Sequence, residues 1–94
     1  MSKENNPQIQ IADQIMGAEY TNAMQVMHNK EEFQMAFLNI IAQSGRVVSK
    51  VVTTPGHMKR ILTALRENME KYEQQFGTID ESQAPAQFGF EERK

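Results

Sequence analysis

The chain has 94 residues, the length of a single domain. It contains no cysteine, which excludes a disulfide framework, a zinc–thiolate site and a cysteine nucleophile. The net charge is −2, and the segment 18–77 is close to neutral, so its composition is unlike that of strongly basic nucleic-acid-binding domains. We expect a cytoplasmic protein, because the sequence shows neither a secretory signal nor an apolar stretch that would span a membrane.

Residues 1–17 are predicted to be mostly flexible. Within them, Gln8–Ile11 alternates polar and apolar side chains, as a short edge strand does. Ala12–Met16 has the length of one helical turn, and Gly17 would end it.

Glu19–His28 is predicted to be a strand, because apolar and polar residues alternate and Tyr, Thr and Val are frequent. Asn29 and Lys30 then predict a turn.

Glu32–Ile41 fits two structures. As a strand it places Phe33, Met35 and Phe37 on one face. As a helix it has a stripe formed by Phe33, Phe37 and Ile41, with Asn29 as its cap. We favour the strand, because a hairpin-like turn precedes the segment and a clear strand follows it.

Ser44 and Gly45 predict a second turn, and Arg46–Thr54 is the strongest strand, with four valines and two threonines. Strict alternation assigns Val47, Ser49, Val51 and Thr53 to one face. It assigns Arg46, Val48, Lys50 and Val52 to the other.

A long helix is predicted to begin after Thr54, which is a suitable N-cap, with Pro55 in its first position and Gly77 as its stop. Apolar residues at helical spacing form one stripe: Met58, Ile61, Leu62, Leu65, Met69, Tyr72 and Phe76. The remaining residues, 78–94, are predicted to form a flexible acidic tail, within which Gln87–Phe90 is the part with most tendency to order.

The fold class is therefore α+β: a sheet of three or four antiparallel strands in a β-β-β-α domain over residues 18–77, with one long helix packed on one face. The uncovered face would keep apolar residues such as Val48, Val52 and Leu38. We therefore predict that a second copy or a protein partner covers this face, with homo-oligomerisation favoured. Neither a membrane nor a nucleic acid is the favoured partner.

We predict no catalytic residue, no metal ligand and no cofactor. The two histidines, His28 and His57, are not spaced as a metal-binding pair, and no serine has a nearby histidine and acid to activate it. Basic residues gather around the predicted helix start and give the alternative function, binding of an anion or of single-stranded nucleic acid. These residues are Arg46, Lys50, His57, Lys59 and Arg60.

The segment EYTNAMQVMHNKEEFQMAF, followed by RVVSKVVTTPGHMKRILTALRENMEKYEQQFGTI, resembles the bacterial and archaeal family called domain of unknown function 3467. The strands of that family are matched by Tyr20, Asn22, His28, Phe33 and Phe37. Its helix is matched by Pro55, His57, Lys59, Arg60, Leu65, Glu67, Asn68, Tyr72, Glu73 and Gly77. The resemblance implies a bacterial cytoplasmic origin and a strand at Glu32–Ile41, and it transfers no activity.

Overall fold

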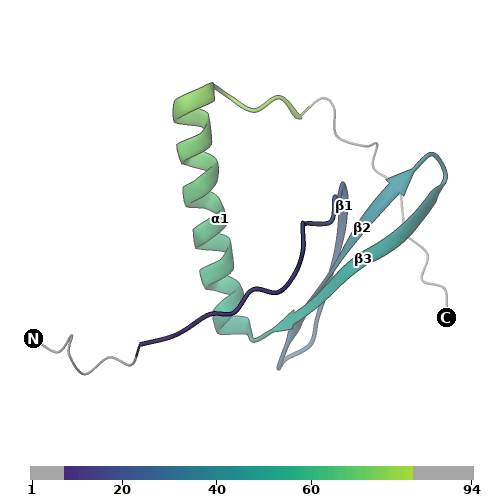
Figure 1. Ribbon diagram of the computed structural model, residues 1–94, viewed down its shortest axis with the longest axis vertical. Coiled ribbons are helices and arrows are strands. Elements are labelled where there is room, and N and C mark those ends of the chain that lie inside the picture. The colour runs from purple at the N-terminus through teal and green to yellow at the C-terminus, as the bar shows by residue number, and fades with distance from the viewer. Residues whose placement is uncertain (1–7, 82–94) are drawn as a thin grey trace, which may run out of the picture.

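A computed structural model describes residues 8–81 as three strands followed by one helix (Figure 1). The strands are β1 (Ala23–His28), β2 (Phe33–Ile41) and β3 (Ser44–Thr53), and the helix is α1 (Pro55–Phe76). All neighbouring strands are antiparallel in the order β1-β2-β3. The α+β class and the strand at Glu32–Ile41 are thus confirmed, whereas residues 1–7 and 82–94, with the predicted Gln87–Phe90 feature, lie outside the described residues.

The turn between β1 and β2 is held by one asparagine side chain. Asn29 Oδ1 accepts hydrogen bonds from the backbone N–H groups of Glu31 and Glu32, at 2.8 and 2.9 Å. The backbone N–H of Asn29 also donates to Glu32 O at 3.0 Å. The turn predicted at Asn29 and Lys30 therefore forms, and the local preference of asparagine for such hydrogen bonds explains it.

The turn between β2 and β3 lies two residues earlier than predicted. It is formed by Ala42 and Gln43, and Ala42 adopts a positive φ of 57°. Ser44 and Gly45 already belong to β3. Gly45 serves packing here, since a Cβ at this position would lie 3.0 Å from Ile40 Cγ1. Gly45 is therefore not a turn residue, and its role is to permit a close approach between the strands.

A β-bulge in β3 changes which side chains share a face. Phe37 pairs with Ser49, but Leu38 pairs with Val47, so Val48 has no partner in β2. Because β3 contains one extra residue at the bulge, each β3 side chain before the bulge lies on the face opposite to the one that strict alternation predicts. Val47 therefore joins the face of Lys50 and Val52, and Arg46 moves to the opposite face, which corrects the face assignments made from strict alternation.

Residues 8–22 form no strand and no helix. The predicted edge strand at Gln8–Ile11 and the helical turn at Ala12–Met16 are therefore both wrong. An alternating pattern makes a strand only where a neighbouring strand accepts its backbone hydrogen bonds, and within residues 8–81 no strand pairs with this segment. The strand predicted from Glu19 likewise begins only at Ala23.

Helix α1 begins and ends as predicted. Thr54 Oγ1 accepts a hydrogen bond from His57 N at 3.2 Å, and Pro55 occupies the first turn. At the other end Gly77, with φ 96°, donates its N–H to Glu73 O at 2.9 Å. These contacts account for both helix boundaries.

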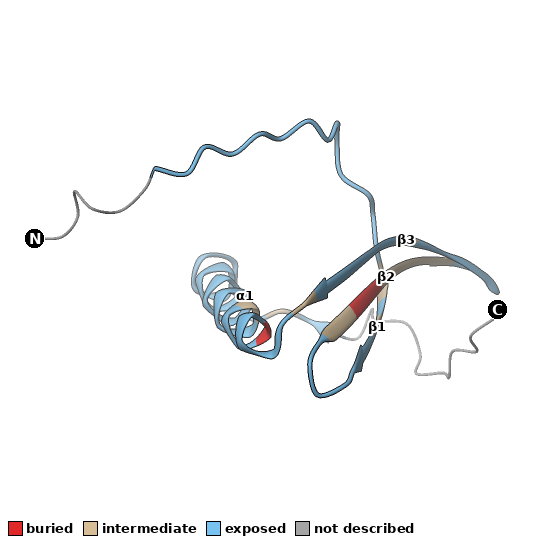
Figure 2. Cartoon of the chain, turned by 90° about the horizontal axis from the view of Figure 1, so that it is seen from below, coloured by how far each residue is buried: buried red, intermediate tan, exposed pale blue. Residues whose placement is uncertain are grey.

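The helix leaves the sheet after its first turns, which corrects the expectation that it packs along one sheet face (Figure 1). Burial is confined to the middle of β2 and the start of α1 (Figure 2). Met35, Ala36 and Met58 are 8–9% exposed, and they are the only buried hydrophobic residues among residues 8–81. Because α1 follows β3 after a single residue, Thr54, its direction is set at that junction, and only its first turns reach the sheet.

Candidate interaction surfaces

The basic residues predicted as an anion or nucleic-acid contact do not form one patch. Arg46 lies near the β2–β3 turn, and at about 3.4 Å per strand residue it is about 20 Å from the helix end of β3. Its guanidinium contacts the Glu19 carboxylate at 3.3 Å. Lys50 pairs with Ala36 on the opposite face of the sheet from Arg46. The β-bulge is what separates these two side chains.

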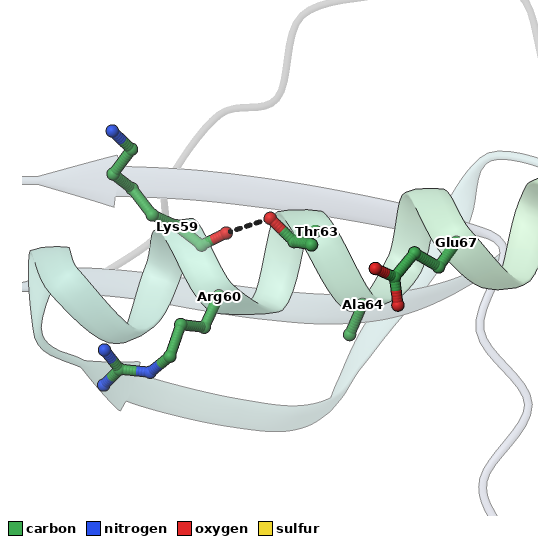
Figure 3. A pocket seen from close by; sticks show the side chains of 5 residues that line it. All are labelled: Lys59, Arg60, Thr63, Ala64 and Glu67. Atoms are coloured by element: carbon green, nitrogen blue, oxygen red, sulfur yellow. Dashed lines mark hydrogen bonds between the residues drawn. The ribbon is translucent and has the colours of Figure 1, made fainter.

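The other three predicted contact residues, His57, Lys59 and Arg60, are exposed and lie in the first two turns of α1. A shallow depression beside them is lined by Lys59, Arg60, Thr63, Ala64 and Glu67 (Figure 3). Every lining residue belongs to α1, so this surface lies along a single helix. The charged ends of Lys59 and Arg60 point away from each other (Figure 3). The geometry therefore shows no convergent site for a phosphate.

Residues suited to catalysis or metal binding are also dispersed. Among residues 8–81, no three histidine, aspartate or glutamate side chains gather closely enough to hold a metal ion. The ring of His28 stacks on Phe33, with centroids 5.3 Å apart, at the end of the β1–β2 hairpin. Within this same part of the chain, no helix is both long enough and apolar enough to cross a membrane.

Both faces of the sheet present apolar side chains to the surroundings. The Met35 face, defined by Met35 and its cross-strand neighbours, includes Met24, Val26 and Val51. The Ala36 face, defined in the same way, includes Met27, Val47 and Val52. These six side chains are 42–54% exposed. The prediction of apolar residues on both sheet faces is confirmed, although the bulge changes which valines belong to each.

The apolar stripe of α1 is a second uncovered surface. Beyond the buried Met58, this stripe is 50–65% exposed at Leu62, Leu65, Met69, Tyr72 and Phe76. We call Met58 and these five residues together the helix seam. The rings of Tyr72 and Phe76 contact each other within it, with centroids 4.9 Å apart. The sequence predicted the stripe, but it did not show that the stripe would be left uncovered.

The extended segment before β1 is a third uncovered surface. Ile9, Ile11, Ile15 and Met16 are 80–94% exposed. Soluble monomers rarely leave several such surfaces open to water, because each buried apolar side chain stabilises a fold by about 1.5–3 kcal/mol.

A comparison with protein-family models matches residues 1–81 to a protein of unknown function, DUF3467. This match includes all three strands and the helix. No curated protein and no solved structure matches the chain.

Proposed function

The chain belongs to the DUF3467 family, and on the basis of its geometry we propose that it is a small non-enzymatic assembly module that works as an oligomer of identical copies. The observation that carries the proposal is the imbalance between buried and exposed apolar residues. Met35, Ala36 and Met58 are buried, whereas seventeen large hydrophobic side chains in the described segment are exposed.

A second copy is the simplest cover for this surface. The sheet faces, the helix seam and the extended segment all carry exposed apolar side chains, so each can pack against an apolar surface of the same kind. Methionines at positions 24, 27 and 69 are suited to such contacts, because an unbranched thioether adapts to the shape of its neighbour. A chain of this size builds only a small core by itself, and oligomerisation is a common remedy.

The alternative function, binding of single-stranded nucleic acid or another anion, receives less support. Such binding combines clustered cations with aromatic side chains on which bases stack. Here the sheet divides Arg46 and Lys50 between its faces, and Arg46 is paired with Glu19. Apolar contacts therefore outweigh electrostatic ones in the proposal.

The proposal is tested by thermal unfolding at several protein concentrations. Because association stabilises only the folded chains, the unfolding midpoint of an oligomer rises with protein concentration. We expect a continuous rise from low to high micromolar protein. A midpoint that stays constant over this range would contradict the proposal, since a folded monomer has no such dependence.

A further inference from the structure

We propose that α1 pairs with α1 of a second copy in an antiparallel orientation, with the helix seam as the contact. This inference rests on the proposed self-association and specifies which surface makes it. Helix α1 stands clear of the sheet for most of its length, so the seam is accessible to another helix (Figure 1).

The spacing of the helix seam is that of paired helices. Its residues, at positions 58, 62, 65, 69, 72 and 76, are separated by alternating steps of four and three. This is the heptad repeat that keeps one apolar seam facing a partner helix. The seam covers about 27 Å of helix at 1.5 Å per residue.

The order of side chains along the seam matches an antiparallel partner. Reversing one helix about position 67 places Met58 opposite Phe76 of the second copy. The same operation places Leu62 opposite Tyr72 and Leu65 opposite Met69. Two of these three layers combine an aliphatic side chain with an aromatic one, so each large ring faces a smaller side chain across the contact. A parallel pair would instead place Tyr72 on Tyr72 and Phe76 on Phe76.

The charges beside the seam give an independent reason for this orientation. Next to the seam, one flank carries Lys59, Arg66 and Glu73, with Glu70 one position further out. The other carries Ile61, Asn68 and Gln75, with Lys71 one position further out. In an antiparallel pair, like flanks face each other. Reversal about position 67 then brings Lys59 of each copy toward Glu73 of the other, in two symmetric pairs. It also brings the two Arg66 side chains together near the two-fold axis, where Glu70 of each copy lies beside Arg66 of the other and offsets their repulsion. In a parallel pair, the charged flank would face the neutral one, and these attractions would be lost.

This arrangement also accounts for an unfavourable feature of the single helix. The first turn of α1 has no acidic residue and its last turn has no basic residue, although the helix dipole favours both. An antiparallel neighbour places its acidic half beside Lys59 and Arg66, and its positive end beside Glu70 and Glu73. The charge distribution that opposes the dipole in one helix is therefore satisfied by the second.

Spin labels on single cysteines test the orientation, and the absence of native cysteine makes each label unique. We expect Asn68→Cys, close to the two-fold axis, to give a short distance between labels in the oligomer. Gln75→Cys should give a longer one, because its two copies are separated by about 24 Å along the helix axis. Short distances at both sites would indicate a parallel pair, and long distances at both would indicate contact through other surfaces. The first result overturns the antiparallel orientation, and the second overturns the helix pairing; both leave the self-association intact. The absence of any distance between chains, together with the mass of a single chain, overturns both proposals.

Charge reversal provides a second test that does not alter the seam. Glu70→Arg should weaken association at least tenfold, because it faces Arg66 of the second copy, and adding Arg66→Glu should restore it. Glu67→Lys is the matched control: it makes the same change in net charge, and it also creates a like-charge neighbour four residues away, but on the outer side of the helix. Equal weakening by Glu70→Arg and Glu67→Lys, or no recovery in the double variant, would contradict the proposed register.

Discussion

Asn22 shows how a single side chain replaces a missing pair of strand hydrogen bonds. Its Nδ2 donates to Ile40 O at 2.9 Å, and its Oδ1 accepts from Ile40 N at 2.9 Å. Ile40 lies beyond the end of β1, so its backbone groups on that side have no strand partner. The asparagine therefore extends the β1–β2 pairing by one step. Asn22 is one of the residues in which the chain resembles the family, and its hydrogen bonds give it a structural role.

We predict that Asn22→Ala lowers the free energy of unfolding by about 1–3 kcal/mol, because both hydrogen bonds are lost and the Ile40 backbone groups keep no protein partner. Urea unfolding measures the effect. Asn39→Ala is the matched control, since Asn39 lies on the same hairpin and makes no side-chain hydrogen bond within residues 8–81. Equal losses in the two variants would show that the pairing with Ile40 contributes nothing specific.

The boundaries of the helix could be predicted from particular residues, because each boundary depends on local chemistry. Thr54, Pro55 and Gly77 act through contacts with residues at most four positions away. The strand at Phe33–Ile41 was harder to predict, since its pattern of apolar residues also fits a helix. The turn before this segment and the strand after it favoured the strand.

Features that depend on pairing between elements could not be predicted in the same way. The bulge at Val48 follows from the register of β3 against β2, and it moved Arg46 out of the predicted basic site. Similarly, the stripe of α1 was evident in the sequence, but whether the sheet covers it depends on the direction in which α1 leaves β3. The predicted basic residues are thus dispersed for a geometric reason, whereas the steps of four and three in the helix seam were visible in the sequence.

For helix α1, we predict that Leu65→Gln lowers the free energy of unfolding by about 2 kcal/mol or more, because an apolar side chain in the contact is replaced by a polar amide without a partner. In an isolated chain Leu65 is 59% exposed, so the same change should cost far less. Denaturant titration at a fixed protein concentration measures the loss. Ala64→Gln introduces the same residue one position away, outside the helix seam, and should change stability by less than about 0.5 kcal/mol. A loss for Leu65→Gln as small as that for Ala64→Gln would contradict burial of the seam.

At the scale of the molecule, residues 8–81 present two strand edges, two sheet faces with exposed apolar side chains and one free helix, all arranged around a very small buried core. This arrangement is unusual for a chain that folds alone, because folding must offset about 1–2 kcal/mol of backbone entropy for each ordered residue. Within residues 8–81, Met35, Ala36 and Met58 are the only buried hydrophobic residues that help to offset this cost. Folding and association are therefore expected to be coupled, as they are in many obligate oligomers.

The mass in solution tests this account most directly. Sedimentation equilibrium of the full chain, from low to high micromolar concentration, should give at least twice the 10.8 kDa of one copy. A well-folded protein that stays at 10.8 kDa throughout that range would contradict the claim that a second copy covers the exposed apolar surface.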